Sequence, residues 1–234
     1  MLQLLESGKD VVTANKALLA EHGPELFDRA RELGRTIAFE ASVAGGIPIV
    51  ANISQCLSAN QVQSVRAILN GTSNYILSKM ESDGLNFQEG VSDAQRQGYA
   101  EADPSMDIDG TDAAQKASIL AALAFKVPFD FKAVSYCGID QVAPEDLNYA
   151  DELGYAIKHI AYGNLIDHEV SVSAYPTLVS KQLLLSQVGQ QMNALEIFCE
   201  EIGSTVYYGP GAGPKPTASA VKADLVDLTN GGWP

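Results

Sequence analysis

Cysteine is scarce in this 234-residue chain, which contains only three cysteines. They are Cys56, Cys137 and Cys199, which lie far apart and form no Cys-x-x-Cys motif or Cys/His cluster. This spacing argues against a zinc site and against a disulfide framework. We therefore expect reduced, buried thiols and no catalytic cysteine.

Basic residues are also few. Fifteen lysines and arginines face 29 aspartates and glutamates, so the net charge is −14. A polyanion is a poor partner for nucleic acid or for an anionic membrane surface, and we expect neither as a partner. Apolar runs of membrane-spanning length are lacking, and the first residues do not resemble a signal peptide, so the sequence predicts a cytoplasmic protein.

A Gly-x-Gly-x-x-Gly turn is absent from the start of the chain, although the pattern there is that of an α/β unit. Residues 11–13 read as a strand, a helical stretch opens near Lys16, and Pro24 begins a second helix that ends at Gly34. Residues 36–42 read as the next strand. This order predicts a parallel strand–helix–strand unit that starts in the middle of a sheet.

The remaining chain alternates helices and strands before becoming rich in strands. Residues 62–69 alternate apolar and polar side chains, which predicts a strand with one buried face. The other expected elements are helices over 48–58, 75–82, 86–97, 112–126 and 216–228, and strands over 132–136, 155–165, 169–176, 192–199 and 205–208. A helix over 192–202 is an alternative to the strand over 192–199.

One stretch, residues 98–116, stands out chemically. Its final part forms the start of a helix in which Asp112 and Lys116, four residues apart, share the face continued by Ile119 and Leu120. A lysine on a buried face is costly unless it is paired or functional. We weigh a structural ion pair and a catalytic pair about equally on these residues alone.

The carboxylates of the same stretch allow other interpretations. Asp109 is placed to cap the helix. Its neighbours suit a cationic or amino-acid ligand, and an acidic calcium site is an alternative, although the spacing does not fit an EF-hand. The five carboxylates are Glu101, Asp103, Asp107, Asp109 and Asp112.

Three further turns carry weak signals. The turn 70–74 precedes a helix and could hold an anion or simply cap the helix. The glycine loop 209–213 permits close approach of backbone to a ligand. The turn 40–47 could present backbone carbonyls to a cation.

Taken together and in order, these motifs resemble homoserine dehydrogenases over essentially the whole chain. The segments are Val12-Thr13-Ala14-Asn15-Lys16, Glu40 to Pro48, Leu69-Asn70-Gly71-Thr72-Ser73-Asn74-Tyr75, Gly98 to Lys116, and Tyr208 to Val221. The resemblance implies NADP- or NAD-dependent interconversion of L-aspartate 4-semialdehyde and L-homoserine, on the route to threonine, methionine and isoleucine.

The resemblance also implies roles for individual residues. Lys116 matches the proton donor to the aldehyde oxygen, and Asp112 and Glu101 match residues that hold the substrate. Lys16, Gly98 and Gly213 match positions that meet the nicotinamide cofactor. A structural monovalent cation, commonly sodium, matches Glu40, Val43, Gly45 and Ile47.

The implied fold is α/β (α+β), and the implied assembly is a homodimer that pairs strands of the last third. We expect the end of a truncated Rossmann domain over 1–45, a catalytic and dimerisation domain with a mixed sheet and helices on one face over 46–208, and a glycine loop and helix returning to the nucleotide-binding side over 209–234. Residues 1–45 alone lack the fingerprint that holds the pyrophosphate. The alternative is therefore a non-catalytic remnant that only binds substrate or dimerises.

Overall fold

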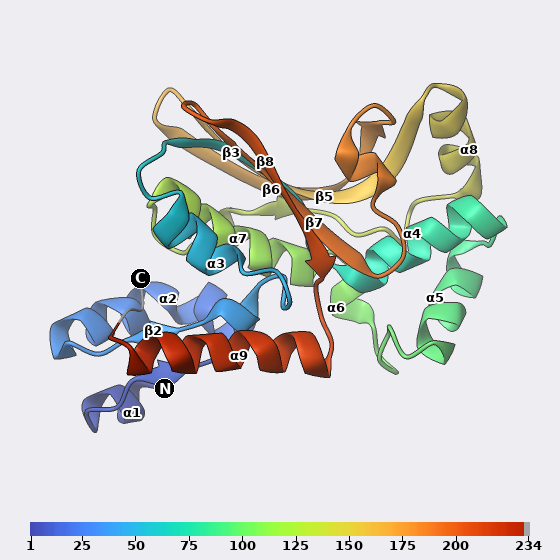
Figure 1. Cartoon of the computed structure of the whole chain (residues 1–234). Coiled ribbons are helices and arrows are strands. Elements are labelled where there is room, and N and C mark those ends of the chain that lie inside the picture. Colours follow the sequence, from blue (N-terminus) through green and yellow to red (C-terminus); the bar gives the residue numbers. More distant parts are fainter. Residues whose placement is uncertain (232–234) are drawn as a thin grey trace.

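Two separate β-sheets organise the computed structural model, which describes residues 1–231 (Figure 1). A small parallel sheet pairs β1 with β2, and a larger mixed sheet has the order β4-β6-β5-β3-β7-β8. The strands are β1 (Val11–Val12), β2 (Ile37–Ala38), β3 (Val62–Ile68), β4 (Ser135–Tyr136), β5 (Tyr155–Ile166), β6 (Glu169–Ser180), β7 (Met192–Cys199) and β8 (Gly203–Pro210).

Helices connect these strands, and short 3-10 or π turns interrupt the connections. The α-helices are α1 (Leu2–Glu6), α2 (Lys16–Leu33), α3 (Ile49–Ala51), α4 (Gly71–Asp83), α5 (Phe87–Arg96), α6 (Ser105–Ile108), α7 (Thr111–Phe125), α8 (Pro144–Glu152) and α9 (Pro214–Thr229). The short turns are η1 (Glu40–Ser42), η2 (Asn52–Cys56), η3 (Phe131–Ala133) and η4 (Leu184–Gln187). The predicted mixed α/β fold is confirmed.

The parallel unit at the start of the chain is confirmed, with Val11 paired to Ile37 across the small sheet. The side chain of Asn15 accepts from the backbone N–H of Leu18 and so begins α2, and Gly34 ends it in the left-handed conformation. Of the strand expected over 36–42, only Ile37 and Ala38 form β2. The expectation is wrong for the residues after them, because the chain turns into η1 at Glu40.

Pro24 does not begin a second helix, and this expectation is wrong. It lies inside the single helix α2, whose buried face includes Leu19 and Leu26. Proline cannot donate to the preceding turn, yet packing on both sides holds the helix together. The neighbouring Gly23 leaves room for an aromatic ring, because a Cβ there would lie 2.7 Å from Cγ of Phe129.

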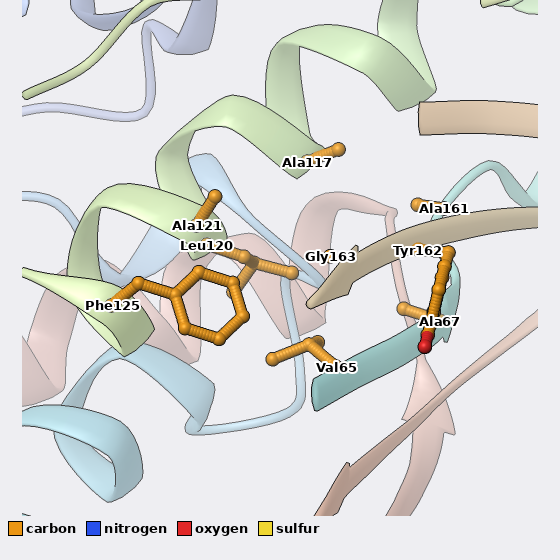
Figure 2. Close-up of a pocket in the computed structure, with 9 residues that line it drawn as sticks. All are labelled: Val65, Ala67, Ala117, Leu120, Ala121, Phe125, Ala161, Tyr162 and Gly163. Atoms are coloured by element: carbon orange, nitrogen blue, oxygen red, sulfur yellow. The ribbon is translucent and has the colours of Figure 1, made fainter. Parts of the chain in front are cut away.

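Helix α7 packs on one face of the large sheet. Figure 2 shows Ala117, Leu120, Ala121 and Phe125 of α7 pointing toward β3 and β5, where an apolar crevice of only about 10 Å³ remains. A space of that size holds at most about one water molecule. The interface is therefore packed core, and it positions the first turn of α7 rigidly against the sheet.

A second apolar cluster joins α4, α5 and α8 beside the sheet. Tyr75 and Met80 of α4 pack there with Leu147 of α8. The sequence analysis did not anticipate α8, or the single turn α6 between the acidic residues. In α8 only Leu147 and Ala150 are buried, so the helix has little apolar periodicity to detect.

The chain passes twice between the large sheet and the N-terminal unit, and the two passages touch. The backbone N–H of Gly46 donates to the carbonyl of Pro210 over 2.9 Å. A Cβ on Gly45 would lie 2.6 Å from the Gly211 carbonyl oxygen. After the second passage α9 packs beside η1, so both ends of the described chain lie on the same side (Figure 1).

The opposite face of the large sheet, called the outer face below, carries no α-helix among residues 1–231 (Figure 1), and it mixes exposed apolar side chains with polar ones such as the Arg66–Glu196 ion pair. Tyr175, Phe198, Val206 and Tyr208 on this face are 39%, 43%, 40% and 61% exposed. Large exposed apolar patches mark interaction surfaces.

Two remaining observations concern thiols and membranes. Cys199 is buried, but Cys56 and Cys137 are exposed, so the expectation of three buried thiols is wrong for two of them. Within residues 1–231 no helix has the length and apolarity needed to cross a bilayer.

Candidate active site

The first turn of α7 places two charged side chains at the edge of the large sheet. The N-cap residue of α7 is Gly110, so the expectation that Asp109 caps the helix is wrong; Asp109 lies one residue earlier and accepts from the backbone N–H of Thr111 over 2.8 Å. Asp112 follows in the first turn, where a negative charge is favourable, and it is 5% exposed. Lys116 lies one turn later on the same face.

Lys116 uses two of its three donors inside the protein. Its Nζ lies 2.7 Å from Asp112 Oδ2 and 2.9 Å from the carbonyl oxygen of Leu69 at the end of β3. Its side chain is 12% exposed. Since an ammonium group has three N–H donors, one donor remains for a ligand among the described residues.

A second lysine reaches the same carboxylate from the N-terminal unit. Lys16, the first residue of α2, places its Nζ 3.1 Å from Asp112 Oδ1. Burial alone would raise the pKa of Asp112, but Lys116 and Lys16 hold it below its ordinary value. The two parts of the fold therefore meet at an ionised aspartate between two lysines.

Asn70 is a member of this site that the sequence analysis treated only as part of a turn. Its Oδ1 accepts from the N–H of Ser73 and caps α4, while its Nδ2 donates to Asp112 Oδ2 over 2.8 Å and to Asp107 Oδ1 over 2.7 Å. The capping signal was visible in the sequence. The bridge between two carboxylates depends on tertiary contacts 37 and 42 residues away.

Asp107 contributes a second carboxylate to the site. Burial raises its pKa, and the nearby charge of Asp112 acts in the same direction, while the hydrogen bond from Asn70 opposes the rise. The Ser73 hydroxyl donates to the Asp107 carbonyl over 2.7 Å and fixes the backbone of α6 against α4. The group is half-buried and therefore reachable by a small ligand.

Asn193 on β7 is a second missed residue. Its Nδ2 donates over 3.0 Å to the same Leu69 carbonyl that accepts from Lys116, and the residue is 1% exposed. A Cβ on Gly211 would lie 2.0 Å from this Nδ2, so the glycine loop passes directly over the amide. An isolated asparagine in an apolar strand gives no sequence signal for this role.

The predicted cation ligands lie on the first passage between the sheets. The carbonyl oxygens of Val43 and Gly45 accept no hydrogen bond from any described residue, so they are available to a cation. The carboxylate of Glu40 is engaged differently, because it accepts from the N–H groups of Val50 and Ala51 over 2.9 and 2.8 Å. Burial raises the pKa of Glu40, although these hydrogen bonds oppose the rise.

Asp224 on α9 lies beside Glu40, and it is a further buried carboxylate that was not predicted from the sequence. Its Oδ2 accepts from the Glu40 N–H over 3.1 Å, and its Oδ1 is buried without a hydrogen bond from a described residue. Burial raises the pKa of Asp224 to about 7, and the charge of Glu40 acts in the same direction.

Not every predicted site residue reaches the lysine–aspartate cluster. Glu101 is exposed, and no described residue makes a hydrogen bond or ion pair with its carboxylate. Gly98 lies in the connected loop, which is held by the Thr72 hydroxyl donating to the Tyr99 carbonyl over 2.8 Å. Gly213 begins α9 with a φ of +116°.

The calcium alternative finds no geometric support in the part of the chain that is described. Within residues 1–231 no three His, Cys, Asp or Glu side chains gather in a geometry that could hold a metal ion. Several of the acidic side chains are used locally, as when Asp103 accepts from the N–H of Ser105.

Comparison with known proteins follows the same division of the chain. The profile of the family described as homoserine dehydrogenase matches residues 48–226. A second profile, described as the NAD-binding domain of homoserine dehydrogenase, matches residues 1–40.

Individual relatives carry the same name. The homoserine dehydrogenase of Pseudomonas aeruginosa is 48% identical over 97% of this chain and 52% of its own length. That of Bacillus subtilis is 43% identical over 97% of this chain and 52% of its own length. The chain thus spans about half the length of the curated relatives it matches.

Solved structures agree. A homoserine dehydrogenase from Thiobacillus denitrificans superposes with a TM-score of 0.96 at 46% identity, covering 97% of this chain and 53% of that one. A homoserine dehydrogenase from Staphylococcus aureus gives a TM-score of 0.84 at 39% identity, covering 98% of this chain and 53% of that one. The chain belongs to the homoserine dehydrogenase family.

Proposed function

We propose that this chain carries the substrate-side machinery for NADP- or NAD-dependent interconversion of L-aspartate 4-semialdehyde and L-homoserine. The observation that carries the proposal is Lys116, held by Asp112 and the Leu69 carbonyl with one donor left open. A lysine fixed in this way can protonate a carbonyl oxygen at a defined position.

In the proposed reduction, Lys116 holds a proton on Nζ and donates it to the aldehyde oxygen, which becomes the hydroxyl of homoserine. A bound nicotinamide supplies the hydride that adds to the aldehyde carbon. Asp112 keeps the ammonium group of Lys116 oriented through Oδ2, and Lys16 forms an ion pair with Oδ1 of the same carboxylate. In the reverse direction Lys116 accepts the hydroxyl proton.

Carboxylates are the natural partners of the substrate ammonium group. We assign this role to Asp112 and Glu101, as the resemblance implies. Asp112 already receives hydrogen bonds or ion pairs from Asn70, Lys116 and Lys16. Its contribution is therefore mainly to orientation, and Asp107 is a further carboxylate placed to contact the substrate.

The residues that meet a nicotinamide cofactor need open space beside them. A Cβ on Gly98 would have no atom within 4 Å, and the nearest atom to a Cβ on Gly213 would be Pro216 Cδ at 3.6 Å. We propose that Lys16, Gly98 and Gly213 meet the cofactor there. Residues 1–45 contain no glycine-rich phosphate fingerprint, so these residues alone do not hold the pyrophosphate.

A monovalent cation is the second proposed ligand. The backbone oxygens of Val43 and Gly45 support it, since hard cations prefer oxygen ligands. We assign Glu40 and Ile47 to the same site, and the cation, with sodium as first candidate, would stabilise the passage between the sheets.

We propose a homodimer formed through the outer face, and the exposed Tyr175, Phe198, Val206 and Tyr208 support it. The division into 1–45, 46–208 and 209–234 is also proposed, and residues 232–234 lie outside the described part. A cytoplasmic location and the three biosynthetic routes are kept as proposals from the sequence.

The test follows NADPH consumption with L-aspartate 4-semialdehyde. We expect little turnover by the 234-residue chain alone, and turnover when the nucleotide-binding segment that precedes the matched region in a relative is joined to it. In the joined enzyme Lys116→Ala should abolish turnover with an unchanged circular dichroism spectrum, whereas the exposed Lys222→Ala should be neutral.

Two results would contradict these assignments. Full activity of Lys116→Ala would remove Lys116 as the proton donor. No activity in the joined enzyme, together with retained homoserine binding, would support the remnant alternative.

A further inference from the structure

A polar cavity lies at the far end of α4 from the proposed active site. Its volume is about 470 Å³, within the range of small-ligand sites. It is bounded by the last turns of α4, the start of β5 and the segment that follows η4. The lining is almost entirely polar, with Ser78, Glu81, Lys158, Lys181, Gln187 and Gln190 contributing most of the functional groups.

Lys158 is the unusual member of this lining. Its side chain is 3% exposed, and its Nζ makes no hydrogen bond with any described residue. The nearest carboxylate oxygen, Glu81 Oε2, is 3.9 Å away, too far for a direct hydrogen bond. A mostly buried side chain whose ammonium group has its one ion-pair partner among the described residues at 3.9 Å is costly, and a ligand with an acceptor oxygen would complete the coordination of this group.

Lys158 lies on the outer face of the sheet, the face of Tyr175, whereas the lysine–aspartate cluster lies on the side of α7. Lys158 pairs with Thr177 in the β5–β6 register. The adjacent His159 points to the opposite face, where its Nε2 lies 2.9 Å from the Cys137 carbonyl oxygen. Burial lowers the pKa of His159 and of Lys158, so neither environment is that of a hydrated surface.

The charges around the cavity are balanced in sign. Lys158 is positive and Glu81 negative, and their nearest charged atoms lie 3.9 Å apart, so a small molecule lying alongside the pair can contact both. Lys181 forms its own ion pair with Asp151. A dianion such as phosphate would meet the Glu81 carboxylate beside Lys158, whereas a molecule with one carboxylate and one ammonium group would match both charges.

The segment over the cavity is held firmly. The Gln190 N–H donates to the Ser78 hydroxyl over 3.1 Å. The Asn74 side-chain amide donates to the carbonyls of Val188, Gln190 and Met192 at 3.2, 3.0 and 3.2 Å. These bonds fix α4 to the loop, so the cavity has rigid walls.

We propose that this cavity is a second binding site of the protein, which takes a small α-amino acid with its carboxylate on Lys158 and its ammonium group toward Glu81. The amides of Gln187 and Gln190 and the hydroxyl of Ser82 offer further hydrogen bonds to the ligand. The site does not depend on the oxidoreductase chemistry proposed above.

Isothermal titration calorimetry of the 234-residue chain with glycine, L-serine and L-glutamine tests this proposal. Propionate and n-propylamine serve as ligands with only one of the two charges. We expect at least one amino acid to bind with a millimolar or lower Kd, and both single-charge compounds to bind about tenfold more weakly or not at all.

Variants distinguish this cavity from the active site. Lys158→Met and Glu81→Gln should each weaken amino-acid binding by about tenfold or more, because each removes a charge-assisted contact. Lys116→Ala should leave the binding unchanged. Glu81 is partly exposed, so its variant tests the site even if replacement of the buried lysine perturbs folding.

Three outcomes would overturn the proposal. They are no heat of binding with any of the amino acids up to about 10 mM, binding that survives both Lys158→Met and Glu81→Gln, and binding that is lost in Lys116→Ala but kept in Lys158→Met. Equal binding of propionate and the amino acids would replace the zwitterion by a simple carboxylate and would also contradict the proposal.

Discussion

At the scale of single residues, one carboxylate connects most of the site. Asp112 receives Lys116, Lys16 and Asn70, which come from α7, α2 and the turn before α4. The i, i+4 spacing predicted the Asp112–Lys116 pair from sequence, because it depends only on helix geometry. Lys16 entered through the family resemblance, and Asn193 and Asp224 could not be predicted because their partners are set by tertiary packing.

Replacing Asp112 tests this connection through stability. The folded state holds the Asp112 pKa below its ordinary value of 3.8, so the ionised group stabilises the fold above that pH and the gain is lost as pH falls through the folded-state pKa. We expect Asp112→Asn to lower the free energy of unfolding by about 2–4 kcal/mol near pH 7, because it leaves two lysines without their partner.

Urea denaturation at several pH values measures the effect. The gap between wild type and Asp112→Asn should narrow as the pH is lowered below 3.8, where wild type also loses the charge. Exposed Asp140→Asn is the matched control and should follow wild type throughout. A constant gap across this range would show that the carboxylate charge is not what stabilises the site.

The contribution of Lys158 to stability is expected to depend on pH at the alkaline end, and it is unfavourable where that of Asp112 is favourable. Burial lowers its pKa from 10.5, so the charged form destabilises the fold at neutral pH and this cost fades as the pH rises toward 10.5. We expect Lys158→Met to raise the free energy of unfolding by up to about 2 kcal/mol at pH 7.

In thermal melts of both proteins, the difference in melting temperature between Lys158→Met and wild type should shrink between pH 8 and 10. The exposed Lys132→Met serves as the control for removing a positive charge from a chain of net charge −14. Equal melting temperatures of Lys158→Met and wild type at pH 7 would mean that the buried ammonium group carries no such cost.

At the scale of elements, long and regular segments were predicted and short ones were not. The strands β5 and β7 and the helices α4, α5 and α7 followed from periodicity and capping residues. In the strand expected over 132–136, the first two residues belong to η3, and only Ser135 and Tyr136 pair with β6. Two-residue strands carry too few side chains to show a pattern, and neighbouring elements determine them.

Helix α2 continues through Pro24, although proline disfavours a helix interior, because packing of its buried face holds it. Pro24 interrupts its hydrogen bonding, and we expect Pro24→Ala to restore a donor and raise the free energy of unfolding by about 1–3 kcal/mol. Differential scanning calorimetry would record a higher melting temperature. Ala17→Gly at the start of the same helix should act in the opposite direction, by about 1 kcal/mol. An unchanged or lower melting temperature of Pro24→Ala would indicate that the helix has adapted to the proline ring.

At the scale of the whole molecule, the outer face is the surface through which we propose that a second copy binds. Its strand pattern was predicted, but its exposure was not, because alternation tells which side chains share a face and not what covers them. A second copy would remove Phe198, Val206 and Tyr208 from water.

We therefore expect Val206→Glu to shift the chain from dimer to monomer, because a charge buried in an apolar interface is costly. Sedimentation velocity at several protein concentrations would measure the change. Ala133→Glu, which adds the same negative charge on the exposed η3, should leave the assembly unchanged. A monomeric wild type, or a dimer that persists in Val206→Glu, would rule out this face as the interface.

The two adjacent passages between the sheets have a mechanical consequence. A single linker would let the N-terminal unit and the large sheet swivel freely, whereas two linkers joined by the bond from Gly46 to Pro210 resist torsion. Bending about the line through both linkers is opposed by the core that α2 and α7 share, in which the rings of Phe27 and Phe129 stack 5.0 Å apart. The distance from Lys16 to Asp112 is therefore fixed by packing as well as by charge.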